Sequence, residues 1–428
     1  MHEGKTVTYR FVHAADIHLD SPLRSLALRD ADLADLIGNA TRRAFVRVID
    51  LCLDEQVDAL VIAGDLYDGD QTSMKTARFL AEQLRRLDQA GIRTFIIRGN
   101  HDALSRITKE LVLPDSVKIF GGRAEAIAID RAPGRVPVVV HGLSFAQPHA
   151  PESLLGRFRP VVDGAVNIGL MHTSLGGAPG HDLYAPCSLA DLQATGFHYW
   201  ALGHIHRRSA TEGACAIVMP GMPQGRDINE AGPKSVTLVT IADNRSIHLD
   251  ERVTSVAEFE RISVDASGID DWRDLVSAVT RALENERDAV ASEHLVARVR
   301  ITGATPLAWR IRRDSDLLTT EADDRASVIG RCWIEQLEIA CYPVEQRGET
   351  SGAPIRELHR LIEDDILGSP SFQNELTSVA EEIRAQLPQE CRDLFGKDEA
   401  AFEEVIARLA QEGAEGVMAR LEAPGGEA

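Results

Sequence analysis

The sequence YWALGHIHRR, residues 199–208, changes from apolar to polar at a single point. Tyr199–Gly203 has the composition of a short buried strand, and His204 and His206 follow it directly. Within a strand the two imidazoles would point to the same face, because side chains alternate with a period of two. They could then bind one metal ion or two neighbouring ions. The alternative is that one histidine caps the strand and the other is solvated, since short motifs often match by chance.

The same change from apolar to polar recurs after other strand-like segments. The polar residues concerned are Asp16 and His18, Asp65 and Asp68, Asn100, His101 and Asp102, and His172. Each motif alone is weak, because a single D-x-H is usually structural and Gly-Asn is a good turn pair. In open α/β sheets, however, the loops at the carboxyl ends of strands build the binding site. Together with residues 203–206, these segments therefore predict that carboxylate, amide and imidazole ligands converge on one metal centre.

The order of the segments predicts an α/β fold for the first part of the chain. Strand-like runs alternate with amphipathic helical runs over about 250 residues. Phe45, Ile49 and Leu53, for example, recur at a spacing of four and form one apolar stripe. Beyond Arg252 the pattern becomes that of a small α+β domain, and from Gln346 it becomes acidic and helical. The predicted domains are residues 1–252, 253–345 and 346–428.

Composition restricts the class of protein further. The 428 residues are 44% hydrophobic and 26% charged, as in an ordinary soluble protein. No apolar run is long enough to span a membrane, no signal peptide is evident, and the six cysteines are scattered without a C-x-x-C pair. We therefore expect a cytoplasmic protein. The net charge of −20 argues against binding nucleic acid through a broad basic surface.

Five short motifs identify a family resemblance. The series ADIH, GDLYD, GNHD, MH and GHIH resembles the calcineurin-like metallophosphoesterase superfamily. The segments HTSLGGAPGHDLYAPCSLADL and PGMPQGRDINEAGPKSVTLV are similar to SbcD-like DNA-repair exonucleases, and in particular to their YhaO-like branch. The resemblance extends over about residues 8–345. It implies a metallophosphoesterase β-sandwich flanked by helices, a small α+β capping domain and a helical C-terminal region.

The resemblance also implies a set of metal ligands. It assigns one metal ion to Asp16, His18 and His206, a second to Asn100, His172 and His204, and a bridging role to Asp65. Such mixed ligands suit divalent ions such as Mn²⁺. A bridging carboxylate can hold two ions roughly 3.5–4 Å apart, which is the spacing used for in-line displacement at phosphorus. The expected nucleophile is a metal-bridging hydroxide.

His101 has a different implied role. In the family that the chain resembles, the histidine after the asparagine faces the substrate, where it can protonate the leaving oxygen or stabilise the transition state. Asp102 is expected to orient the imidazole of His101. Asp68 is expected to support the site without binding a metal ion, although some nucleases of the family carry histidine there.

Several further residues are weaker candidates for substrate contact. His181 and Tyr184 lie in a glycine-rich loop that could contact the substrate. Arg207, Arg208 and Arg226 could contact phosphate, but a solvated or ion-paired role fits each of them equally well.

The segment 346–428 carries 18 acidic and eight basic residues, and so about half of the net negative charge. Ser369 and Pro370 form a good helix start. Two apolar stripes follow, made of Phe372, Leu376, Val379, Ile383 and Leu387, and then of Phe402, Val405, Ile406 and Leu409. These helices could pack on the nuclease domain or bind a partner. The resemblance to SbcD-like nucleases implies an SMC-type ATPase as that partner, and a homodimer is compatible with the sequence.

The function that these observations favour is a two-metal phosphodiesterase acting on DNA, as an exonuclease or endonuclease in DNA repair. One alternative is a metallophosphoesterase for nucleotides or other small phosphoesters. The other is a non-catalytic, protein-binding scaffold of the same fold. The appended α+β domain argues against the first alternative, and the complete ligand set with His101 argues against the second.

Overall fold

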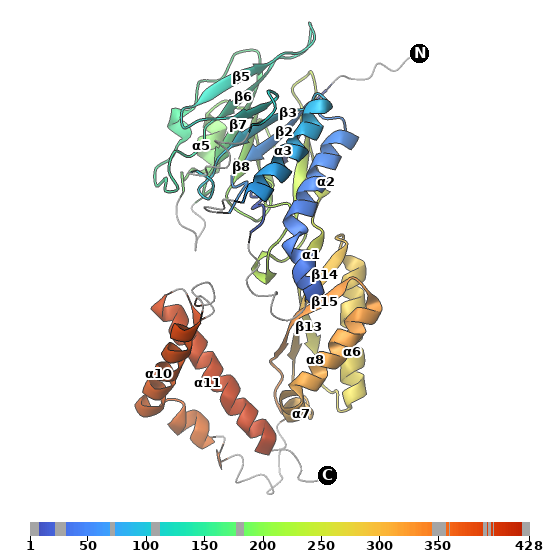
Figure 1. The fold of residues 1–428 in the computed structure, drawn as a ribbon, viewed down its shortest axis with the longest axis vertical. Coiled ribbons are helices and arrows are strands. Elements are labelled where there is room, and N and C mark those ends of the chain that lie inside the picture. The colour runs from blue at the N-terminus through green and yellow to red at the C-terminus, as the bar shows by residue number, and fades with distance from the viewer. Residues whose placement is uncertain are drawn as a thin grey trace. The chain divides into compact units, whose positions relative to one another are not determined.

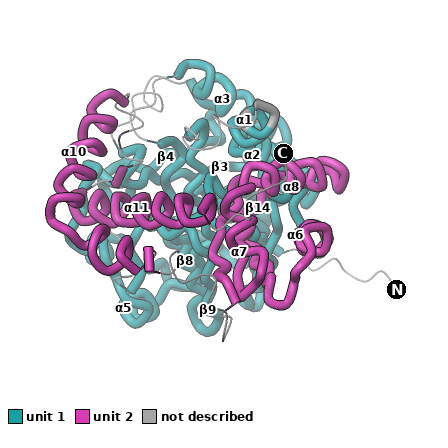
Figure 2. The backbone as a smooth tube through the Cα atoms, turned by 90° about the horizontal axis from the view of Figure 1, so that it is seen from below, with its two compact units in different colours: residues 1–23, 27–259, 290–295 teal, residues 24–26, 260–289, 296–428 magenta. Residues whose placement is uncertain are grey.

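The computed structural model describes residues 8–21, 31–68, 73–103, 112–176, 184–344, 357–358, 360–387, 392, 395–396 and 398–421. Its internal contacts divide the chain into two units (Figure 2). Unit 1 comprises residues 1–23, 27–259 and 290–295, and unit 2 comprises residues 24–26, 260–289 and 296–428. No helix among the described residues is long and apolar enough to cross a membrane.

Unit 1 is built on two six-stranded sheets, which form the β-sandwich that the resemblance implied (Figure 1). The first sheet has the order β12 (Ile247–Val253), β11 (Ser235–Ile241), β1 (Tyr9–Ala14), β2 (Ala59–Ala63), β3 (Arg93–Ile97), β4 (Val117–Ile119). The second has the order β5 (Glu125–Ile129), β6 (Val138–Gly142), β7 (Val166–His172), β8 (Tyr199–Gly203), β10 (Ala216–Met219), β9 (Ser209–Thr211). The central strands β1–β4 are parallel, and so are β6, β7, β8 and β10. Parallel strands bring their carboxyl ends to one edge of each sheet, which is where the candidate ligands follow.

Apolar side chains fill the space between the two sheets and also cover their outer faces. Phe11 and Phe95 of the first sheet meet Ile168 of the second in one buried cluster. On the outer face of the first sheet lie α2 (Ala40–Asp54) and α3 (Met74–Gln89), which contribute Phe45 and Leu84 to a second cluster. The short helices α1 (Ala31–Gly38) and α5 (Leu189–Ala194) also belong to this unit. The sandwich flanked by helices is therefore confirmed.

The first part of unit 2 is the predicted α+β domain. Its sheet has the order β13 (Ala257–Asp265), β14 (His294–Thr302), β15 (Cys332–Ile339). Its helices are α6 (Trp272–Ala289), α7 (Ala308–Arg313) and α8 (Ser315–Ile329). The apolar residues of α8 form no strong stripe.

The C-terminal part of unit 2 is helical, as expected. A π-helical turn (Leu361–Ile366) precedes α10 (Pro370–Gln386) and α11 (Glu399–Leu421). The hydroxyl of Ser369 accepts a hydrogen bond from the backbone N–H of Phe372 at 3.3 Å, which confirms the predicted helix start. The two stripes meet where Leu376 and Ala380 contact Phe402 and Ile406.

Part of the predicted stripe of α10 stays uncovered in this structure. Val379 is 50% exposed and Ile383 is 48% exposed. The helix α11 contacts α7, where the Nε of Arg312 donates a hydrogen bond to Glu415 Oε2 at 2.7 Å. The C-terminal helices thus contact the α+β domain through one face and leave apolar side chains open on another.

Candidate metal centre

The candidate ligands lie in loops that follow strands β1, β2, β3 and β8, and at the end of β7. The backbone at these loops has an unusual conformation. The φ angle is positive at Asp16 (50°), His18 (46°), Asp65 (50°) and His204 (106°), a region that non-glycine residues rarely adopt. Such strained positions cluster at functional sites, where the surrounding structure holds them in place.

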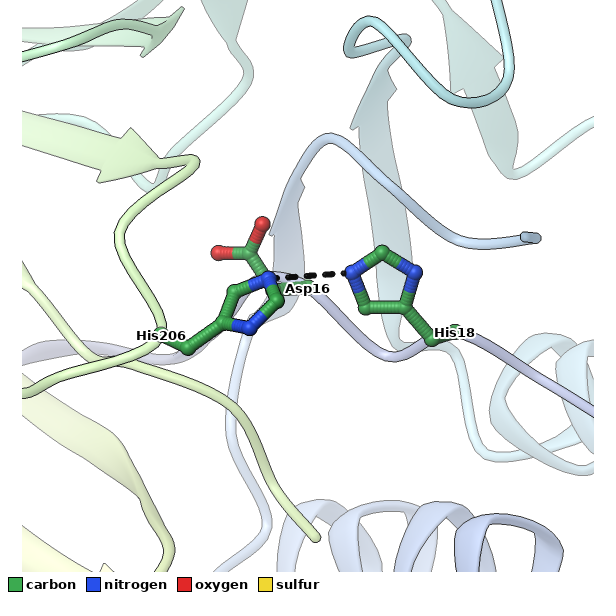
Figure 3. Close-up of side chains that lie close together, drawn as sticks. All are labelled: Asp16, His18 and His206. Atoms are coloured by element: carbon green, nitrogen blue, oxygen red, sulfur yellow. Dashed lines mark hydrogen bonds between the residues drawn. The ribbon is translucent and has the colours of Figure 1, made fainter. Parts of the chain in front are cut away.

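A first ligand group consists of Asp16, His18 and His206, whose ligand atoms all lie within 4.8 Å of one another (Figure 3). The Nε2 atoms of the two histidines face each other at 3.2 Å. Burial lowers the pKa of His18 to about 3, and the nearby Arg226 adds to this effect, so its imidazole is neutral. Two ring nitrogens that approach so closely beside a carboxylate form a donor set that fits a divalent cation.

A second ligand group consists of Asp65, His172 and His204, with Asn100 beside them. The Nε2 of His172 lies 3.3 Å from Asp65 Oδ2 and 3.0 Å from Asn100 Oδ1. His204 Nδ1 lies 3.3 Å from the same Asn100 oxygen. The Nδ1–H of His172 donates to the carbonyl of Ala63 at 2.9 Å, which leaves Nε2 directed at the carboxylate.

Electrostatics also favours a cation in the second group. Burial alone would lower the pKa of His172, but the negative charge of Asp65 outweighs it and raises this pKa to about 9. The position therefore attracts positive charge, and a metal ion can supply that charge in place of a proton. Asp65 also accepts a hydrogen bond from the backbone N–H of His101 at 3.0 Å. A bridge from Asp65 to the first group stays a prediction.

Glycine is required where these loops approach each other. A Cβ atom at Gly99 would lie 2.3 Å from Asp65 Oδ1 and 2.7 Å from the His172 ring. At Gly203 it would lie 2.1 Å from the carbonyl oxygen of Ala63. The glycines of the GNHD and GHIH motifs therefore permit the close packing that brings the ligands together.

The strand arrangement considered for His204 and His206 is wrong. Strand β8 ends at Gly203, and the positive φ of His204 turns the chain directly after it. The two imidazoles consequently belong to different ligand groups, one with His172 and the other with His18. A loop that turns between them can direct the two imidazoles to two positions, as the family resemblance implied.

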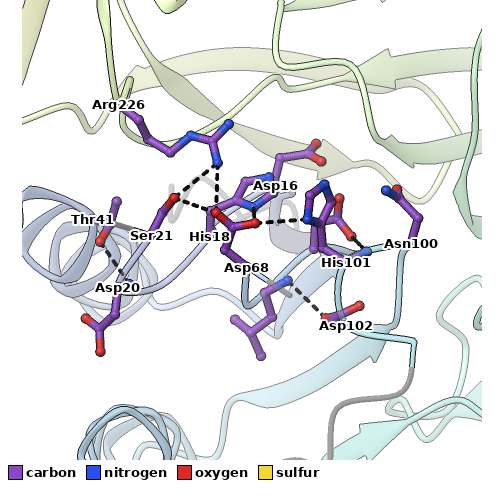
Figure 4. A network of polar contacts seen from close by, with 12 residues as sticks. Asp16, His18, Asp20, Ser21, Thr41, Asp68, Asn100, His101, Asp102 and Arg226 are labelled. Carbon is purple, nitrogen blue, oxygen red and sulfur yellow. Dashed lines mark hydrogen bonds and ion pairs between the residues drawn. The ribbon is translucent and has the colours of Figure 1, made fainter. Parts of the chain in front are cut away.

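The structure gives His101 a different partner from the expected one (Figure 4). His101 Nδ1 lies 2.9 Å from Asp68 Oδ1, and this hydrogen bond raises the pKa of His101. Asp102 instead accepts hydrogen bonds from two backbone amides, Leu66 N–H at 3.0 Å and Gly99 N–H at 2.7 Å. Asp102 is therefore placed to join the loops after β2 and β3, and Asp68 is placed to orient His101, whose side chain is 41% exposed.

Glu230 was not anticipated from the sequence. It ends a short 3-10 helix (Ile228–Glu230), and its Oε1 lies 2.8 Å from His206 Nδ1. It also pairs with Arg226 at 2.7 Å. The GRDINE segment contains the residue, but no spacing rule connects position 230 with position 206.

Hydrogen bonds connect the loop that carries Arg226 and Glu230 with residues 254–257. The buried Gln224 accepts from the backbone N–H of Val256 at 2.7 Å and donates to the carbonyl of Ala257 at 2.7 Å. The hydroxyl of Thr254 donates to the carbonyl of Pro223 at 3.0 Å. Residues 254–257 therefore share a hydrogen-bond network with the loop of the candidate site.

The weaker candidates differ in their placement. The ring of Tyr184 lies edge-on to that of His204, with 5.1 Å between centroids. His181 lies outside the described residues. Arg207 is exposed, and no contact of its side chain with the ligand groups is found among the described residues. Arg208 donates to Thr237 Oγ1 at 2.6 Å and pairs with Glu251 at 3.2 Å.

Comparison with known families accounts for both the sandwich and the α+β domain. Residues 9–208 match the calcineurin-like phosphoesterase family, and residues 259–342 match the middle domain of metallophosphoesterase YhaO. The chain therefore carries a calcineurin-like metallophosphoesterase domain followed by a YhaO-type middle domain. The resemblance to calcineurin-like metallophosphoesterases and to YhaO, noted from the short motifs, is confirmed.

Individual relatives show which metallophosphoesterases the chain is similar to. The chain is 34% identical over 258 residues to the uncharacterized metallophosphoesterase YhaO of Bacillus subtilis (strain 168), which covers 60% of this chain and 63% of that protein. It is 26% identical over 268 residues to the DNA double-strand break repair protein Mre11 of Methanopyrus kandleri, with 59% and 54% coverage. The Mre11 protein of Sulfurisphaera tokodaii is 26% identical over 220 residues, with 50% and 54% coverage. The chain is homologous to these proteins and spans less than two thirds of their length.

Proposed function

We propose that this protein is a two-metal phosphodiesterase that hydrolyses DNA, as an exonuclease or endonuclease. The observation that carries the proposal is the convergence of two ligand groups, with Asp16 in one and Asp65 in the other, beside the half-exposed His101. A scaffold that only binds proteins would not need two such groups. We propose Mn²⁺ as the metal ion in both positions, because the ligands are carboxylate, amide and imidazole without thiolate.

The residues of the chain would divide the work. Bound divalent ions would supply a hydroxide nucleophile near neutral pH and offset the charge of the phosphate. His101, exposed and held by Asp68, would donate a proton to the leaving oxygen or a hydrogen bond to the transition state. The raised pKa of His101 favours the protonated form that such a donor needs.

DNA is the proposed substrate because several homologous proteins are DNA double-strand break repair proteins. The net charge of −20 does not contradict this, since two dications at the site can bind the scissile phosphate without a basic surface. The alternative substrate class is nucleotides or other small phosphoesters, which the same ligand groups could bind.

A nuclease assay tests the proposal. The purified protein is stripped of metal with a chelator, titrated with Mn²⁺, and incubated with end-labelled duplex and single-stranded DNA. Cleavage by the parent protein, with a loss of about 10²–10⁴-fold in the His101→Ala variant, is the expected result. Hydrolysis of a nucleotide panel without cleavage of DNA would favour the small-substrate alternative. No hydrolysis of either class, with metal bound, would favour the scaffold.

We also propose that the C-terminal helices bind a partner, an SMC-type ATPase. The support is the apolar surface of α10, where Val379 and Ile383 are about half exposed. An amphipathic helix placed against a partner helix is a common mode of recognition. The partner would also supply positive charge for long DNA, which this acidic chain lacks.

Substitution of these side chains tests the partner proposal. The double variant Val379→Asp and Ile383→Asp should abolish co-purification with the ATPase and leave the cleavage of short oligonucleotides unchanged. Val328→Asp is the matched control, because Val328 is 82% exposed on α8 of the α+β domain. Undiminished binding by the double variant would contradict a docking role for α10.

A further inference from the structure

A continuous series of polar contacts connects His206, a member of the first ligand group, with His101. It runs through five side chains, which we call the polar chain: His206, Glu230, Arg226, Asp68 and His101. The consecutive distances are 2.8 Å, 2.7 Å, 3.6 Å and 2.9 Å. The polar chain begins at a candidate metal ligand and ends at the candidate proton donor (Figure 4 shows its last three members).

Glu230 sets the orientation of the His206 ring. Its Oε1 accepts the Nδ1–H of His206 at 2.8 Å, so the Nε2 lone pair points toward His18 Nε2. Only 12% of the Glu230 side chain is exposed, and Arg226 pairs with it at 2.7 Å. A carboxylate on the far nitrogen both fixes the tautomer of a metal-binding histidine and makes it a stronger ligand.

Arg226 holds the two carboxylates of the polar chain. Its Nη2 donates to Glu230 Oε1 at 2.7 Å, and its backbone N–H donates to Glu230 Oε2 at 2.8 Å. Its Nη1 donates to Ser21 Oγ at 3.3 Å and lies 3.6 Å from Asp68 Oδ2. Ser21 in turn donates to the same Asp68 oxygen at 2.6 Å. A lysine could not reproduce this, because only the planar guanidinium offers donors in several fixed directions.

We propose that Glu230 and Arg226 are positioning residues of the candidate site. Glu230 prepares His206 to bind its metal ion, and Arg226 keeps Glu230 and Asp68 in the places where they hold His206 and His101. The proposal rests on the proposed function, because it assigns these residues to the same site. The alternative is an ion pair that stabilises the fold without affecting the site.

The first experiment uses the protein without metal and therefore does not depend on activity. Long-range ¹H–¹⁵N spectra of the histidine side chains report which ring nitrogen carries the proton, and a His206→Gln variant identifies the signal. In the parent protein, His206 should carry its proton on Nδ1. Glu230→Gln should keep this tautomer, because an amide oxygen still accepts the bond, and Glu230→Ala should give a mixture of both. An unchanged single tautomer in Glu230→Ala would overturn the role of Glu230.

The second experiment measures metal affinity by calorimetric titration with Mn²⁺. We expect one of two binding steps to weaken by about 10–100-fold in Glu230→Ala, and less in Glu230→Gln, while the other step is unchanged. The matched control is Glu251→Gln on strand β12, which removes a carboxylate that pairs with Arg208. Equal weakening of both steps, or none, would contradict the proposal.

The third experiment tests whether Arg226 positions the site or only stabilises the fold through an ion pair. Arg226→Lys keeps the charge but loses the fixed directions of the donors, so it should weaken the same metal step and lower kcat more than it raises KM. An Arg226→Lys variant with parental metal binding and parental kcat would overturn the role of Arg226. Failure of the proposed function would show differently, as intact tautomer and metal effects in a protein that cleaves no DNA.

Discussion

Asp102 offers the sharpest test of how the candidate site is assembled. Each oxygen of this buried carboxylate accepts a backbone N–H, one from Leu66 after β2 and one from Gly99 after β3. Replacing Asp102 with alanine would leave both amides without an acceptor inside the protein. We expect the variant to lose stability first, and to lose activity only as a consequence.

The size of the effect follows from the number of bonds. A buried polar group left without a partner costs about 1–3 kcal/mol, so the two amides together cost about 2–6 kcal/mol. In a domain of this size, each kcal/mol lowers the melting temperature by roughly 2–4 °C, which predicts a decrease of roughly 4–24 °C for the transition of unit 1. Asp102→Asn keeps one acceptor oxygen and should show about half of that decrease.

The assay combines calorimetry with amide hydrogen exchange of the peptides that contain Leu66 and Gly99. Both amides should exchange faster in Asp102→Ala. Asp68→Ala is the matched control, because Asp68 lies in the loop after β2 to which Asp102 is bonded, but is 24% exposed and contacts His101. The Asp68→Ala variant should change the melting temperature little and the rate of DNA cleavage strongly. Parental stability and exchange in Asp102→Ala, together with a large loss of rate, would refute this reasoning and return Asp102 to the role of orienting His101.

Three further outcomes are expected. Asp65→Asn should reduce metal content measured by mass spectrometry, because it removes a buried charge beside His172, and a variant that retains two equivalents of Mn²⁺ and still cleaves DNA would contradict the ligand assignment. His101→Ala should lose about 10²–10⁴-fold in rate and keep its metal ions, whereas loss of metal would make His101 a ligand. Burial lowers the pKa of His13 from 6.5 to about 3, so only the unfolded chain binds this proton between those values. Stability from this residue is therefore complete above pH 6.5 and falls by about 1.4 kcal/mol per pH unit between pH 6.5 and about pH 3. His13→Gln should remove this slope in urea unfolding at several pH values.

The convergence of ligands could be predicted from the sequence because it depends on topology. Once β1, β2, β3, β7 and β8 are recognised as parallel strands, their carboxyl ends must meet at sheet edges, and residues such as Asp16 and His172 follow those ends. The stripe of Phe45 and Ile49 likewise identified α2, since periodicity directly reflects which face is buried.

The supporting contacts could not be predicted, because they depend on the paths of loops. Glu230 approaches His206 from 24 residues away, and Asp102 turns from the adjacent His101 toward two backbone amides. No periodicity describes either approach. The family resemblance implied that His204 and His206 serve different metal ions, but the positive φ angle of His204 that separates them is not signalled in the sequence.

The anchoring of residues 254–257 by Gln224 has a practical consequence for protein engineering. These residues look like the beginning of the connection to the next domain, yet their backbone is bonded to the loop that carries Arg226 and Glu230. A chimera that exchanges the α+β domain for that of a homologue should therefore retain the chain up to Phe259 and residues 290–295, which also belong to unit 1. A junction placed before Thr254 would bring a foreign backbone segment against the loop of the candidate site.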